Sequence, residues 1–220
     1  MKENIDQKIQ AFFQKFPAKS YPKGEVVLHA GARGNLFFFV ETGSIKMMIT
    51  SAQGQNLVLH IFHSDSCFPL LNLVNDKNIY DFVTMVPSTI RTVPQQELVS
   101  FLHENVDVLF EFQLRLLKGL QGLLHRTEQT AFVPAYKRVA NLLLYFARHF
   151  SEHSASDAQK MIEIHITHQE ISEWLGLSRE NVSIHMKQLE HEGFIRKKEN
   201  LVEIMDIEKL RKFANPYQVS

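Results

Sequence analysis

The sequence predicts an α+β chain with an N-terminal antiparallel β-roll of the jelly-roll type, a long dimerisation helix, and a C-terminal winged helix-turn-helix. Three observations predict this class. Short apolar runs broken by glycines fill residues 21–94, an apolar repeat with helical spacing follows over residues 95–130, and two capped helices flank a glycine turn near the C-terminus. We place the domain boundaries at residues 1–100, 101–133 and 134–220.

The composition excludes several classes of protein. Lys+Arg and Asp+Glu both number 24, so the global charge neither favours nor excludes nucleic acid. The single cysteine, Cys67, cannot form an internal disulfide or hold zinc or an iron–sulfur cluster alone. The charged residues 1–10 are unlike a secretory signal, and no apolar run approaches the roughly 18 residues of a membrane span. We therefore expect a cytoplasmic protein without a membrane partner.

The N-terminal region alternates apolar runs with turn signals. Four runs are predicted as strands: Glu25–His29, Leu36–Glu41, Ser44–Ile49 and Asn56–Phe62. Glycines lie between them, and several short strands at such intervals are typical of a sandwich, roll or barrel. The run Phe37–Phe39 is too apolar for a solvated edge, so we expect it in the core.

The predicted long helix carries two adjacent apolar columns. The first holds Phe110, Leu117, Leu120 and Leu124. The second holds Leu109, Leu116 and Leu123. A face this wide must be covered by the roll, by a partner helix or by both. We expect both, which predicts a parallel dimer through the first column; packing on its own domain alone is the alternative. Pro134 should end or kink the helix.

The C-terminal third is expected to open with an amphipathic helix over Tyr136–Phe150, a polar connector over residues 151–160 and a strand over Met161–Ile166. A capping box follows, in which Thr167 caps a helix start and Glu170 reaches back.

The next residues have the spacing of a helix-turn-helix. Gly176 tolerates the positive φ that a sharp turn between helices needs, and Ser178 can cap a second helix that runs from Arg179 to about His191. A basic hairpin, the wing, is predicted over residues 193–205.

Eleven side chains of this region are predicted to contact DNA: Thr167, His168, Gln169, Ser178, Arg179, Glu180, Ser183, Ile184, Lys187, Arg196 and Lys197. Arg179 can donate to guanine and Glu180 can accept from cytosine, whereas Lys187 is better placed for phosphates. The alternative is a small helical domain with a solvated charged face. The acidic balance after residue 150, with 12 Asp+Glu against 9 Lys+Arg, favours that alternative.

Residues 168–193, HQEISEWLGLSRENVSIHMKQLEHEG, resemble the DNA-binding motif of the CRP/FNR superfamily. Residues 21–49 resemble the β-roll of that family, and Lys137–Phe150 resembles the helix that opens its DNA-binding domain. The resemblance implies a sensor roll and a dimer that binds a palindromic operator. It also implies a regulator, expected to be an activator, that works with RNA polymerase.

Individual positions of the recognition helix follow the resemblance, with one departure. Arg179 and Glu180 match the Arg-Glu pair of the family, and Ser183 matches a position that reads bases in the FNR branch. Ile184 replaces a second Arg. An isoleucine cannot donate to guanine but can touch a thymine methyl, so the operator is expected to differ from the usual family site.

The resemblance also bears on the effector. Cyclic-nucleotide members use a Gly-Glu pair and an Arg-Ser pair in the roll, and the matching stretches here, Cys67–Asn72 and Asn78–Phe82, hold neither the Glu nor the Arg. The adenine-contacting Thr-Ser pair of the family aligns with Leu123 and Leu124. A buried cyclic phosphate would lack its counter-charge, so we expect no cyclic AMP binding. Iron–sulfur sensing needs more cysteines than one.

The identity of the effector stays open at this point. Haem on His29, His60 or His63, a redox role for Cys67, an apolar ligand and constitutive activity are the alternatives. An apolar pocket is expected to use Phe68, Leu70, Leu71, Tyr80, Leu123 and Leu124. A haem- or apolar-ligand sensor that acts mainly through protein partners is the alternative function.

An enzyme is not expected. Cupin enzymes share the roll and use clustered histidines for a metal, but His60 and His63 are three residues apart on a predicted strand, so they point to opposite faces. We predict no catalytic residues and no metal site.

Overall fold

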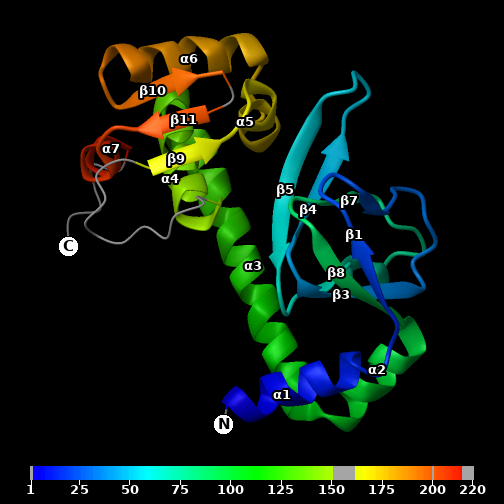
Figure 1. Ribbon diagram of the computed structural model, residues 1–220. Coiled ribbons are helices and arrows are strands. Elements are labelled where there is room, and N and C mark those ends of the chain that lie inside the picture. The colour runs from blue at the N-terminus through cyan, green and yellow to red at the C-terminus, as the bar shows by residue number, and fades with distance from the viewer. Residues whose placement is uncertain (1, 151–161, 200, 215–220) are drawn as a thin grey trace. The chain divides into compact units, whose positions relative to one another are not determined.

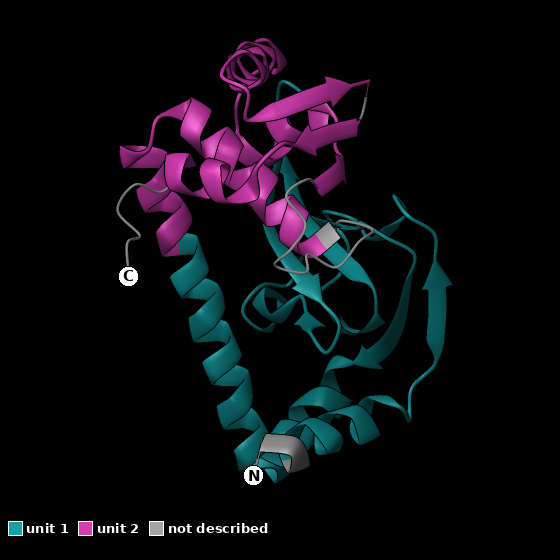
Figure 2. Ribbon diagram, turned by 60° about the vertical axis from the view of Figure 1, so that its left-hand side comes forward, with its two compact units in different colours: residues 1–123 teal, residues 124–220 magenta. Residues whose placement is uncertain are grey.

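The computed structural model describes residues 2–150, 162–199 and 201–214. The chain divides into two compact units, residues 1–123 and 124–220 (Figure 2). The first unit holds the predicted roll and most of the long helix, and the second holds the predicted winged helix-turn-helix. Among the described residues, no helix is long and apolar enough to cross a membrane.

The roll consists of two antiparallel four-stranded sheets (Figure 1). One sheet has the order β1-β8-β3-β6, and the other has the order β2-β7-β4-β5. The strands are β1 Ala18–Tyr21, β2 Val26–Leu28, β3 Leu36–Thr42, β4 Ser44–Thr50, β5 Asn56–His63, β6 Cys67–Phe68, β7 Asp81–Thr84 and β8 Ser88–Pro94. The four strands predicted from the sequence are present as β2 to β5, with bounds that differ by at most one residue at either end.

Strand β3 is buried on both faces, which explains its three consecutive phenylalanines. Phe38 faces the other sheet, in a cluster with Phe68 and Phe82. Phe37 and Phe39 face the opposite way, where the ring of Phe13 stacks on Phe39 at 4.2 Å. Because side chains alternate along a strand, this double burial needs a layer of helices outside the sheet. The expectation that Phe37–Phe39 belong to the core is confirmed.

The outer layer consists of α1 Lys2–Phe13, α2 Gln95–Glu104 and the start of α3 Val106–Phe132 (Figure 1). The sequence predicted continuous helical spacing from residue 95, and a long helix from residue 101. The structure instead breaks the helix at Asn105, whose backbone N–H and side-chain amide both donate to the carbonyl of Phe101. Asn105 thereby ends α2, and the long helix begins at Val106.

The second unit packs four helices and a three-stranded sheet around one core. These elements are α4 Ala135–Phe150, β9 Ile162–His165, α5 His168–Leu175, α6 Arg179–His191, β10 Ile195–Lys198, β11 Leu201–Ile204 and α7 Ile207–Ala214. The sheet order is β10-β11-β9, and all its pairs are antiparallel. Pro134 separates α3 from α4, as predicted. The predicted connector over residues 151–160 lies outside the described residues.

Candidate nucleic-acid interface

The first helix of the predicted helix-turn-helix begins with the expected capping box. The N–H of Glu170 donates to Oγ1 of Thr167 at 3.1 Å, and the N–H of Thr167 donates to Oε2 of Glu170 at 2.8 Å. Two backbone donors that the helix start leaves free are satisfied in this way. The start of α5 is therefore fixed by local sequence, and it holds Thr167, His168 and Gln169 at the surface of the unit.

The turn into α6 uses the two residues that the sequence singled out. Gly176 ends α5 with φ 63° and ψ 33°, a left-handed conformation that glycine adopts without strain. Ser178 caps α6, because its hydroxyl oxygen accepts from the N–H of Asn181 at 3.2 Å. The hydroxyl of Ser172 also donates to the carbonyl of Leu177 at 2.8 Å. The two helices are thus joined by a closely held turn of three residues.

The second helix, α6, has one buried face and one solvent-exposed face. Val182, Met186 and Leu189 are buried in the core of the unit. The open face carries Arg179, Glu180, Ile184 and Lys187 as exposed side chains and Ser183 as a half-buried one. Helix α6 lies at the periphery of its unit, so nothing among the described residues of that unit covers this flank (Figure 1). Such a helix can enter the major groove of DNA.

Two titratable side chains at the helix starts, Glu180 and His168, have pKa values below their ordinary values for different reasons. The backbone N–H of Glu180 and the hydroxyl of Ser178 lower the pKa of the Glu180 carboxyl, so this group is an acceptor at neutral pH. Burial lowers the pKa of His168, and the cations of Lys197 and Arg179 lower it further. His168 is therefore neutral at neutral pH, and its Nε2 lies 2.9 Å from Nζ of Lys197.

The basic residues of the wing divide between its two faces. Lys197 reaches toward His168, and its backbone N–H donates to Oε1 of Glu190 at 3.0 Å. Arg196 and Lys198 lie on the other face, where Nζ of Lys198 is 2.7 Å and Nη1 of Arg196 is 3.7 Å from the carboxylate of Glu203. Glu203 is only 4% exposed. The sequence predicted the basic wing but not this buried carboxylate, which partly neutralises it.

Two arginines hold the end of α5, and sequence reasoning missed both. Arg126, near the end of α3, donates to the carbonyl of Trp174 at 3.3 Å, and Arg138 of α4 donates to the carbonyl of Leu175 at 3.4 Å. The last carbonyls of a helix lack partners within the helix and carry partial negative charge. These arginines therefore tie the first helix of the motif to α3 and α4. Helical periodicity gives no signal for such contacts.

The residues predicted for dimerisation lie exposed along α3. The exposed fractions are 60% for Phe110, 59% for Leu117, 49% for Leu120 and 62% for Leu124. In the second column Leu116 and Leu123 are also exposed, whereas Leu109 packs against the core of the roll. Most of the wide apolar face is thus left open by the chain itself.

The residues predicted for an effector pocket are distributed over different parts of the structure. Phe68 is fully buried, and its ring lies 4.8 Å from that of Phe82. Tyr80 packs against the same cluster, whereas Leu70 packs against the cluster under the helices and Leu71 is exposed. Leu123 and Leu124 are exposed on α3. Phe68 therefore lies in the core between aromatic rings.

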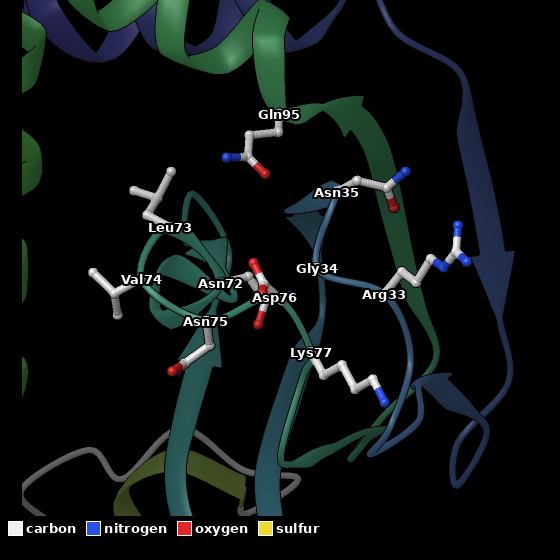
Figure 3. A pocket seen from close by; sticks show the side chains of 10 residues that line it. All are labelled: Arg33, Gly34, Asn35, Asn72, Leu73, Val74, Asn75, Asp76, Lys77 and Gln95. Atoms are coloured by element: carbon white, nitrogen blue, oxygen red, sulfur yellow. The ribbon is translucent and has the colours of Figure 1, made fainter.

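A pocket of about 570 Å³ lies elsewhere in the roll (Figure 3). It is lined by Arg33, Gly34, Asn35, Asn72, Leu73, Val74, Asn75, Asp76, Lys77 and Gln95. Figure 3 shows Gln95 extending from the start of α2 toward Asn72 and Asp76. Gly34 is required there, because a Cβ atom on it would lie 2.9 Å from the carbonyl oxygen of Asn75.

The other candidate sensor residues are held in ordinary structural contacts. Cys67 is buried, and burial raises the pKa of its thiol far above the usual range, so it is a poor nucleophile at neutral pH. The ring of His60 packs edge-on against Phe62 at 4.7 Å. Across the described ranges, no cluster of three or more His, Cys, Asp or Glu side chains is arranged to hold a metal ion.

Comparison with known proteins identifies both units. The family described as Crp-like helix-turn-helix domain matches residues 137–213, and the family described as cyclic nucleotide-binding domain matches residues 18–105. The chain belongs to the CRP/FNR superfamily. Its relatives in this superfamily are transcription regulators rather than enzymes, and this CRP/FNR chain is a DNA-binding regulator of the same type.

The relatives of this CRP/FNR chain match it over most of its length. The cAMP-activated global transcriptional regulator CRP of Pasteurella multocida is 23% identical over 194 residues, which cover 87% of this chain and 91% of the relative. The CRP of Haemophilus influenzae is 25% identical over 183 residues, which cover 82% of this chain and 78% of the relative.

Two solved structures share the CRP/FNR fold with this chain. The c-di-GMP responsive regulator CLP of Xanthomonas campestris superposes with a TM-score of 0.80 at 19% identity, covering 90% of this chain and 98% of that one. A CRP/FNR family regulator from Thermus thermophilus superposes with a TM-score of 0.74 at 21% identity, with the same coverage of both chains. At these identities the superpositions establish the fold.

Proposed function

We propose that this CRP/FNR regulator works as a homodimer that places two copies of α6 in successive major grooves of a palindromic operator. The observation that supports this most directly is the open flank of α6. Arg179, Glu180 and Lys187 are exposed there, while the opposite face of the helix is sealed in the core. Arg179 donates to guanine, Glu180 accepts from cytosine, and the remaining cations contact phosphates. A two-fold dimer then requires two half-sites about one helical turn apart.

A second copy of the chain is the proposed partner of α3. The exposed side chains Phe110, Leu117 and Leu124 recur every seven residues, and this spacing favours a parallel pair of helices. Leu117→Glu would bury two carboxylates at such a seam, and we expect it to produce a monomer. Val74→Glu, at a side chain 79% exposed in the roll, is the matched control and should leave the dimer intact. Sedimentation of both variants distinguishes the two results.

The proposed effector is not cyclic AMP. The stretch Asn78–Phe82, which resembles the part of the roll where cyclic-nucleotide members carry an Arg-Ser pair, includes Asp81 here. Its Oδ1 accepts from the N–H of Ala30 at 2.9 Å and lies 3.6 Å from Nδ1 of His29. A cyclic phosphate beside this carboxylate would meet a like charge, which is unfavourable at such short range.

The proposed mechanism is a shift between two arrangements of the dimer. Effector binding in the roll biases the relative placement of the two α6 helices, and only one arrangement matches the spacing of the half-sites. We place the protein in the cytoplasm. There it would act as an activator, with RNA polymerase as its partner in addition to DNA.

Sequencing of genomic fragments retained by the purified protein tests this function. We expect a palindromic site to be enriched, and we expect Arg179→Ala to abolish the enrichment. Arg211→Ala removes the same charge from an exposed side chain on α7 and is the matched control. Equal loss in both variants, or no enriched site with the unaltered protein, would contradict the proposal.

A further inference from the structure

Ile184 has an unusual environment for a large apolar side chain. It is 60% exposed on α6, and its neighbours one turn away along the helix, Glu180 and Lys187, are exposed and charged. In the described residues from Ala135 onward, it is the one large apolar side chain that is exposed. Most other apolar residues described in this region pack in or against the core.

The position of Ile184 on the helix explains its exposure. Each residue of an α-helix advances by about 100°, so a step of two residues is about 200° and Ile184 points about 160° away from Val182 and from Met186. Both of those side chains are fully buried or nearly so. Ile184 therefore occupies the middle of the face that is directed away from the core. Core packing cannot account for an isoleucine at this position.

The flank around Ile184 matches the chemistry of a DNA groove. Arg179 and Lys187 supply positive charge toward the two ends of the flank, and Ser183 beside it supplies a hydroxyl. The guanidinium, ammonium and hydroxyl groups of these three residues can each form hydrogen bonds with base edges or phosphates. An isoleucine has one counterpart in the major groove, because the C5-methyl of thymine is the apolar group presented there.

We propose that Ile184 is a specificity-determining residue that packs on the C5-methyl of one thymine in each half-site. This inference rests on the proposed function, because it requires α6 to lie in the major groove. Ile184, in the middle of the exposed face of α6, would then make a contact that depends on one methyl group of the DNA. The flanking polar residues then read the neighbouring base pairs by hydrogen bonds.

Replacing thymine by uracil in the operator removes this methyl group and leaves the hydrogen-bonding edge of the base unchanged. The probe is the duplex enriched in the fragment-sequencing experiment, with each half-site thymine replaced in turn. At one position we expect the full-length protein to lose affinity about fourfold, and about 15-fold when both half-sites are changed. Ile184→Ala should bind the thymine and uracil duplexes equally well at that position.

A matched control separates this contact from general effects of substituting α6. Gln188 is exposed on the same helix and contacts Glu192, so Gln188→Ala should keep the full uracil penalty. If every thymine tolerates the change to uracil, or if Ile184→Ala keeps the same penalty as the unaltered protein, the inference is wrong while the proposed function stands. If no site is enriched at all, both fail.

Discussion

Nζ of Lys197 lies 2.9 Å from Nε2 of His168, so the wing contacts the first helix of the DNA-binding motif through these two side chains. His168 must be neutral to accept from the ammonium group. Burial, Lys197 and Arg179 all lower its pKa below the ordinary value of 6.5. The junction between wing and helix is therefore sensitive to acid.

This junction predicts how stability depends on pH. As pH falls below about 6.5, the unfolded chain takes up a proton on His168 that the folded chain resists, so the free energy of unfolding decreases. Trp174, the single tryptophan, packs against the core of the second unit and reports its unfolding.

Urea titrations at pH 7.5 and 5.5 should show a smaller difference in the free energy of unfolding for His168→Gln than for the unaltered protein. His191→Gln, exposed at the end of α6, should behave as the unaltered protein does. Identical pH dependence in all three would contradict this account.

The carboxylate of Glu203 limits the positive charge of the wing. Glu203→Gln should free Arg196 and Lys198 for phosphates and raise the affinity for any duplex about two- to fivefold at low salt. The gain should shrink as salt is added, because the charges are then screened. Glu208→Gln removes the same charge from an exposed side chain on α7. Equal gains in the two variants would show that the location of Glu203 has no role.

Arg126 is expected to stabilise the DNA-binding unit through α5. Arg126→Met removes the donor to the carbonyl of Trp174, and we expect the unit to lose about 1–2 kcal/mol of stability. Arg148→Met makes the same change at an exposed position of α4 and should cost a few tenths of a kcal/mol at most. Unfolding followed by tryptophan fluorescence measures both. If Arg126→Met lost no more stability than the control, the hydrogen bond from Arg126 to Trp174 would not be stabilising.

Calorimetric titration with cyclic AMP tests the proposed absence of a cyclic-nucleotide site. Because the stretch Asn78–Phe82 has no Arg and includes the carboxylate of Asp81, we expect no binding in the micromolar range. Asp81→Asn would lessen the repulsion but supply no cation, so it too should fail to bind. Saturable micromolar binding to the unaltered chain would overturn this part of the account.

Local sequence was sufficient for the elements whose signals are contiguous. The capping box at Thr167, the turn at Gly176 and the sealed face of α6 follow from spacing alone, and the structure contains all three. The strands that were not predicted are weak in the sequence. Strand β6 has two residues, and β8, Ser88–Pro94, mixes threonines and an arginine with its apolar residues, although it lies between two partners in its sheet.

Features that depend on contacts distant in sequence could not be predicted. Phe68 fills the core because β3, β5 and β7 bring Phe38, Phe62 and Phe82 around it. Arg126 and Trp174 are 48 residues apart, and their contact requires the completed fold of the second unit. The partners of Glu203 are near in sequence, but its burial is a property of the sheet.

Hydroxyl-radical footprinting of the purified protein on its enriched operator tests the central claim most directly. Two symmetric copies of α6 should protect two equivalent patches, about one helical turn apart, on one side of the duplex. Arg179→Ala should erase both patches, and Leu117→Glu should do the same because it separates the copies. A single protected patch, or protection that survives Arg179→Ala unchanged, would contradict the account.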